Sequence, residues 1–115
     1  MIAGNLFSSL PPALETEHFE TLAQGRGVTI ERIVSSGHTS PESGWYDQDH
    51  REWVIVLRGN AVLEYASGER IELDVGAYVD IAAHVRHRVI HTSSAPPTVW
   101  LAVHFPAEPG DPHHR

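Results

Sequence analysis

The stretch that decides the fold is Glu52-Trp-Val-Ile-Val-Leu-Arg-Gly59. Its apolar core, residues 53–57, is short and continuous, which is typical of a strand buried on both faces. The run stops at Gly59-Asn60, a turn signal, and residues 61–65 then predict a return strand. A hairpin around a buried strand is therefore expected at the centre of the fold.

Further short strands are predicted on both sides of this hairpin. Each is rich in β-branched or aromatic residues, and Gly, Pro or Ser-Gly turn signals separate them. The additional strands are predicted at residues 28–34, 70–74, 78–81, 87–91 and 98–105. Seven or eight strands spaced by about 8–12 residues indicate an all-β sandwich or barrel.

The first residues have a different pattern. Leu14, Phe19 and Leu22, with acidic residues early in the segment, predict a short amphipathic helix within residues 13–23, ended by Gly25 and Gly27. The alternative is an irregular arm with one helical turn. We expect an N-terminal arm over residues 1–27, a barrel over residues 28–105 and a flexible tail over residues 106–115.

Composition limits the classes of function. The chain has 115 residues, 41% of them hydrophobic, which suits one domain with one core. It has no cysteine, no apolar run near the ~20 residues of a membrane span, and no secretion signal at its start, so we expect a cytoplasmic protein. Its net charge is -7 and it has no lysine, which argues against nucleic-acid or membrane partners and against Schiff-base chemistry.

The central stretch resembles the first motif of the cupin superfamily, and specifically small single-domain bacterial cupins of the conserved-barrel type. That motif has two histidines, a carboxylate five residues after the second, and an apolar strand that ends in glycine. Glu52 and Gly59 match its second half. Asp47 and Trp45 stand at the two histidine positions, and tryptophan cannot ligate a metal because its only polar group is an N–H donor.

The second cupin motif is matched by Gly76 and His87, which have the expected spacing of eleven residues. Ala82 and His84 replace the usual proline and glycine of its turn, and His91 replaces an asparagine. The resemblance covers residues 28–105. It implies a double-stranded β-helix, or jelly-roll barrel, that commonly holds a divalent metal ion.

The predicted metal ligands are Asp47, Glu52, His87 and His91. Residues two apart on a strand share a face, so His91 should point inward with His87, and a bend in the preceding loop can bring Asp47 round. Mixed oxygen and nitrogen donors suit Fe(II), Mn(II), Ni(II) or Zn(II), with open positions for a substrate. The alternative is a metal-free, hydrogen-bonded cluster of the same side chains.

Three further residues are candidates for contacting a substrate. Trp45 and Tyr46 can stack on a planar ligand at the barrel mouth, or plug the barrel. His104 lies in phase with Trp100 on the last strand and can reach the mouth, or pack in the core. Aromatic residues on strand faces also favour a homodimer, the commonest closed assembly.

Two functions follow. The first is a cupin that binds a divalent metal and a small polar molecule, with oxygenase, isomerase or lyase chemistry. The second is a metal-free cupin that serves as a non-catalytic small-molecule-binding or sensory module, which Trp45 at a ligand position favours. Serine-hydrolase, P-loop and dinucleotide motifs do not occur in the sequence.

Overall fold

The computed structural model describes residue 1, residues 3–11 and residues 16–107, and this part of the chain consists of strands and loops. Eight strands are present in the described residues, in agreement with the prediction of seven or eight. They are β1 (His18–Gly25), β2 (Val28–Ser35), β3 (His50–Arg58), β4 (Ala61–Tyr65), β5 (Arg70–Leu73), β6 (Tyr78–Ile81), β7 (His87–Thr92) and β8 (Thr98–Pro106).

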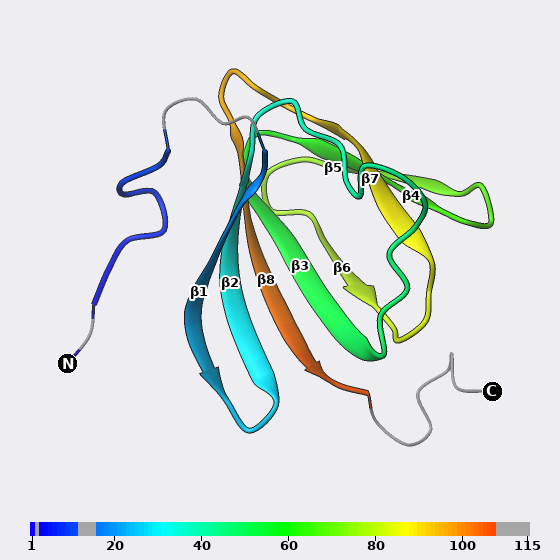
Figure 1. Cartoon of the computed structure of the whole chain (residues 1–115). Coiled ribbons are helices and arrows are strands. Elements are labelled where there is room, and N and C mark those ends of the chain that lie inside the picture. The colour runs from blue at the N-terminus through cyan, green and yellow to red at the C-terminus, as the bar shows by residue number, and fades with distance from the viewer. Residues whose placement is uncertain (2, 12–15, 108–115) are drawn as a thin grey trace.

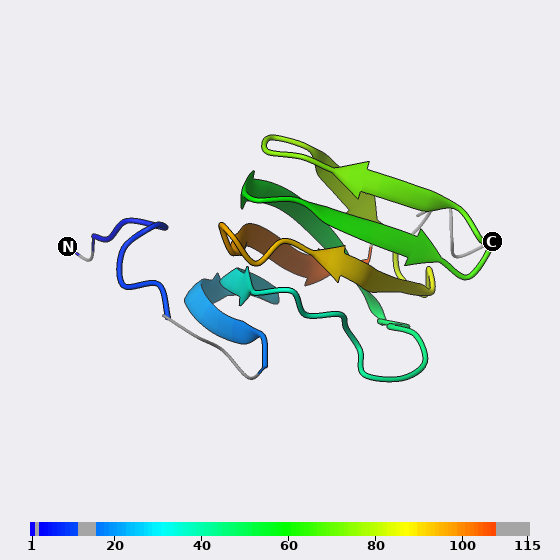
Figure 2. The ribbon, with the colours of Figure 1, turned by 90° about the horizontal axis from the view of Figure 1, so that it is seen from above.

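The strands form two antiparallel sheets that face each other (Figures 1 and 2). The larger sheet has the order β1-β2-β8-β3-β6, and the smaller has the order β5-β4-β7. β3 and β4 are consecutive in the chain but belong to different sheets and do not pair, so the hairpin expected from the sequence does not form. The predicted turn at Gly59-Asn60 instead takes the chain from one layer to the other. The predicted all-β jelly-roll architecture is confirmed. Within the described residues, no helix is long and apolar enough to cross a bilayer.

The core lies between the sheets and comes from the inward side chains of alternating residues. On β3, Val54 and Val56 are 3% and 0% exposed, and Leu63 faces them from β4 of the opposite sheet. Ile33 and Trp100 complete the same cluster from β2 and β8. Because Glu52 has the same strand parity as Val54 and Val56, it too points between the sheets.

Gly59 ends the central strand for a steric reason. Its φ of +80° lies in the left-handed region, which favours glycine. A Cβ atom at this position would lie 2.9 Å from Thr98 Cα and 2.3 Å from Ser93 Oγ. The glycine of the first cupin motif therefore allows the chain to cross closely over the loop that precedes β8.

The predicted N-terminal helix is wrong for the residues that the structure describes. Residues 18–25 form β1, which pairs antiparallel with β2. Gly25 and Gly27 do not end a helix. The chain instead makes a tight hairpin turn between Gly25 and Val28, in which Arg26 and Gly27 have φ of 51° and 79°, as a two-residue hairpin turn requires. Residues 13–15 of the predicted helix, and residues 108–115 of the predicted tail, lie outside the described residues.

Candidate functional site

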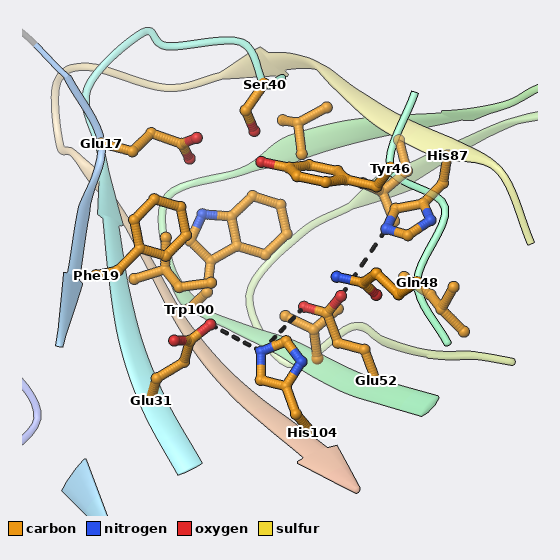
Figure 3. A pocket seen from close by; sticks show the side chains of 15 residues that line it. Glu17, Phe19, Glu31, Ser40, Tyr46, Gln48, Glu52, His87, Trp100 and His104 are labelled. Atoms are coloured by element: carbon orange, nitrogen blue, oxygen red, sulfur yellow. Dashed lines mark hydrogen bonds and ion pairs between the residues drawn. The ribbon is translucent and has the colours of Figure 1, made fainter. Parts of the chain in front are cut away.

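A cavity of about 100 Å³ lies between the two sheets (Figure 3). This volume is below the range of about 300–1,000 Å³ that is usual for drug-sized ligands, so the cavity suits a small molecule. Aliphatic side chains form its floor, Phe19, Tyr46 and Trp100 contribute aromatic rings, and the remaining lining is polar. The polar residues are Glu17, Glu31, Ser40, Gln48, Glu52, His87 and His104.

Glu52 is the first inward residue of the central strand and is 9% exposed. β3 lies between β6 and β8, and this pairing sets Glu52 opposite Ile81 on one side and His104 on the other. Its carboxylate oxygens are 3.8 Å from His87 Nε2 and 4.0 Å from His104 Nε2. Both distances exceed a hydrogen bond, so the Glu52 carboxylate faces the cavity between two imidazoles (Figure 3).

His87 opens β7 in the smaller sheet and is 3% exposed. Its Nδ1 is 2.8 Å from the Val85 carbonyl oxygen. A carbonyl only accepts, so Nδ1–H is the donor, and in the neutral ring Nε2 carries a lone pair that points toward Glu52. The backbones of Tyr46 and His87 exchange two hydrogen bonds, and their rings lie 5.4 Å apart, which holds the imidazole in place.

His104 lies at the centre of a hydrogen-bonded chain. Its Nε2 is 2.8 Å from Glu31 Oε1, and its Nδ1 is 2.9 Å from His50 Nε2. The hydrogen bond with Glu31, followed by the charge of Glu52, raises the pKa of His104, against the opposing effect of burial. A protonated His104 donates from both nitrogens, leaving His50 Nδ1–H to face Asp49 Oδ1 at 3.3 Å.

Tyr46 closes the cavity above Glu52 and His87 (Figure 3). Burial raises the pKa of its phenol, and a hydrogen bond with Ser40 acts in the opposite direction. The phenol therefore remains protonated at neutral pH and can donate a hydrogen bond to a ligand.

Asp47, one of the predicted metal ligands, lies on the outer surface. Its Oδ1 is 2.8 Å from His84 Nδ1, and its Oδ2 is 3.6 Å from Arg86 Nε. The hydrogen bond with His84 is the main cause that lowers the pKa of Asp47. Tyr46 and Gln48, the residues on either side of Asp47, line the cavity instead.

His91 also lies outside the cavity, because β7 does not alternate regularly. His87 pairs with Tyr65 and Val89 with Leu63, but His91 pairs with Val62, so residue 90 is an extra residue in the ladder. Such a β-bulge inverts the parity of every later side chain. His91 is accordingly exposed, with Nε2 3.2 Å from Asn60 Oδ1.

The three predicted substrate residues are placed differently. Tyr46 and His104 line the cavity. Trp45 lies on the other side of the same segment, where the Arg88 guanidinium stacks 4.2 Å from the centroid of its ring. Of the seven predicted site residues, the cavity thus brings together Glu52, His87, Tyr46 and His104.

Glu31 and Glu17 line the cavity and were not predicted from the sequence. Glu31 has the parity of Ile33, whose side chain packs in the core, but Val34 and Arg32 on the other face of β2 are buried as well. With both faces of β2 covered, alternation alone could not identify the inward residues. The sequence feature that could have identified Glu31 is a glutamate within a strand that is otherwise rich in β-branched residues.

The donor geometry limits what metal the site could hold. Among the described residues, no group of three or more His, Cys, Asp or Glu side chains has the geometry of a metal site. The predicted set of Asp47, Glu52, His87 and His91 does not converge, since two of its members face outward. Glu52 and His87 remain as a pair.

Comparison with known proteins decides the family. The model of the cupin domain matches residues 31–104, which contain both motifs. The chain belongs to the cupin family. This cupin is similar to a protein of Ralstonia eutropha JMP134 whose crystal structure carries the provisional name mannose-6-phosphate isomerase. The two sequences are 41% identical, and the structures have a TM-score of 0.88. The match covers 93% of this chain and 100% of the Ralstonia chain.

More distant structures share the fold alone. A cupin superfamily protein of Desulfitobacterium hafniense DCB-2 has 16% identity and a TM-score of 0.70 over 84% of each chain. The protein TT1209 of Thermus thermophilus has 18% identity and a TM-score of 0.75, covering 94% of this cupin and 100% of its own chain. No functionally curated protein matches the sequence.

Proposed function

We propose that this cupin binds a small polar molecule in the cavity between its sheets and transfers protons to and from it, as an isomerase or a lyase does. The observation that carries the proposal is the Glu52 carboxylate, nine-tenths buried and facing the cavity 3.8 Å and 4.0 Å from two imidazoles. Proton transfer between neighbouring atoms of a ligand requires a general base and a general acid that both reach it, and the Tyr46 hydroxyl lines the same cavity as Glu52.

The residues divide into two roles. Glu52 accepts a proton from the ligand, because its carboxylate faces the cavity and both neighbouring imidazoles lie beyond hydrogen-bond distance. Tyr46 donates, because its phenol lines the same cavity and burial raises its pKa, which keeps the hydroxyl protonated. His104 is a positioning residue, since both of its ring nitrogens are engaged by Glu31 and His50. The isomerase name of the Ralstonia relative is compatible with this class of reaction.

A metal-dependent version of the function is the second candidate. Its supporting observation is that Glu52 and His87 lie 3.8 Å apart, close enough for both to reach one Fe, Mn, Ni or Zn ion. Two protein ligands would leave the remaining positions to water or substrate. Removal of metal separates the candidates: proton transfer by these side chains survives a chelator, and metal-assisted chemistry does not.

A screen of small polar molecules by thermal shift, with and without chelator, tests the proposal. Compounds that raise the melting temperature are then incubated in D₂O, and NMR follows exchange of their C–H protons. We expect the rise in melting temperature to be the same with and without chelator. We also expect Glu52→Gln to abolish the exchange of the C–H protons. Glu72→Gln removes the same charge from an exposed position of β5 and is the control. Exchange that persists in Glu52→Gln contradicts the proposal.

The predicted homodimer is also a proposal, supported by the outer face of the larger sheet. Trp53 pairs with Val103 and Ile55 with Leu101 across β3 and β8, and all four are only partly buried in one chain. Tyr78, 62% exposed, extends the apolar face, with its ring 5.4 Å from that of Trp53. A second copy packed on this face would remove it from water.

A further inference from the structure

We propose that the cavity accepts a small organic cation, a protonated amine whose apolar part lies against the aromatic wall, and not a phosphorylated sugar. The inference rests on the proposed function, because it names the class of molecule for the same cavity. Three features of the lining carry it: the balance of charge, the surroundings of Glu52, and the rings above it.

The lining carries acidic groups without matching basic ones. Glu17, Glu31 and Glu52 all face the cavity, and no arginine is among its described lining residues. His104 offsets one carboxylate, because it hydrogen-bonds Glu31. Phosphate sites use arginine, lysine or backbone N–H groups, so a dianionic phosphate would meet repulsion here.

Glu52 is the carboxylate left for a ligand. The Ser35 hydroxyl donates to Glu17, and His104 donates to Glu31. Glu52 is nine-tenths buried, and the imidazoles of His87 and His104 lie beyond hydrogen-bond distance of its carboxylate. A buried charge without a close partner is costly, and a cation that docks beside it removes that cost.

The relation of Glu52 to His87 points to a donor between them. Since His87 Nδ1–H donates to the Val85 carbonyl, the neutral ring turns its Nε2 lone pair toward Glu52 Oε1, 3.8 Å away. Two acceptors that face each other at this distance are satisfied by a group that donates to both. A protonated amine carries several N–H donors on one nitrogen and fits this requirement, whereas an ester or a phosphate offers acceptors.

The walls favour an organic cation over a bare ion. Tyr46 and Trp100 present rings to the cavity, and Phe19 closes its side (Figure 3). The Trp100 N–H is occupied by Ser35, at 3.1 Å, which leaves its ring to pack against a ligand. Aromatic faces attract ammonium groups and the carbon atoms attached to them.

Isothermal titration calorimetry with three ring-matched probes tests the inference. The probes are D-mannosamine, D-mannose and mannose 6-phosphate, in buffer with EDTA at pH 7. We expect the amine to bind at least about tenfold more tightly than mannose, and the phosphate more weakly than mannose. Glu52→Gln should remove the advantage of the amine, and Glu72→Gln, which changes the net charge equally, should retain it.

Other results overturn the inference in distinguishable ways. Mannose binding as tightly as mannosamine rejects the cation but leaves the proposed function standing. Preference for the phosphate rejects the charge argument. A third result is that Zn²⁺ or Mn²⁺ alone stabilises the protein, that Glu52→Gln removes this stabilisation, and that amines have no effect. This result assigns the site to a metal ion. No heat with any probe, together with no stabilising compound in the thermal-shift screen, rejects both the inference and the proposed function.

Discussion

Replacing Gly59 by alanine tests how the turn between β3 and β4 is built. Alanine at φ +80° costs about 1–2 kcal/mol in backbone strain, partly offset by about 0.4–1 kcal/mol from a less flexible unfolded chain. The new Cβ would also lie 2.9 Å from Thr98 Cα, a backbone atom that can give way only if the loop shifts. Overpacking of this kind adds about 1–3 kcal/mol. We expect a total loss of roughly 2–4 kcal/mol.

Gly76→Ala is the matched control, because Gly76 has φ +89° and nothing within 4 Å of an added Cβ. It carries the strain without the clash, so it should cost about 1 kcal/mol. Thermal unfolding followed by circular dichroism measures both, at roughly 5 °C per kcal/mol for a chain of this size. Gly59→Ala should melt about 10–20 °C lower and Gly76→Ala about 5 °C lower. Equal losses would refute the close approach of the two segments.

Three further predictions concern the site and its surroundings. Glu31→Gln should lower the pKa of His104, which an NMR titration of that residue measures. The raised pKa of His104 stabilises the fold at pH below about 6.5, and this contribution is lost at higher pH. The variant should therefore lose more stability at pH 5.5 than at pH 9. Asp47→Asn and His91→Ala should leave ligand binding and metal content unchanged within about twofold by calorimetry and elemental analysis, since both side chains face outward, and a larger change would restore them to the site. Leu101→Arg should convert a dimer to a monomer in light scattering, and an unchanged mass would place the interface elsewhere.

Most strands, and the inward positions of Glu52 and His87, were predictable because they depend on local pattern. The continuous run after Glu52 and the spacing from Gly76 to His87 set the parity of their strands, and both side chains do face the cavity. β1 was mistaken for a helix because Phe19 and Leu22 fit helical spacing. Its actual structure depends on pairing with β2, a tertiary contact that propensity does not contain.

The other differences between predicted and observed positions come from departures from regular geometry. A single extra residue at position 90 turned His91 outward, and a bulge leaves no signature in hydrophobic alternation. Asp47 stands at a ligand position of the motif, but its loop places Tyr46 at the cavity instead. The cavity-facing position of Glu31 follows only from the pairing of β2 with β8, because both faces of β2 are covered and alternation does not distinguish them.

The central claim is that the functional site is the cavity beside Glu52, and histidine-selective NMR tests it most directly. Titration of ¹⁵N-histidine-labelled protein with D-mannosamine, in EDTA, should shift the ring signals of His87 and His104, which line the cavity. The signals of His84 and His91, on the outer surface, should stay in place. Shifts confined to His84 and His91, with His87 and His104 unmoved, would contradict the account.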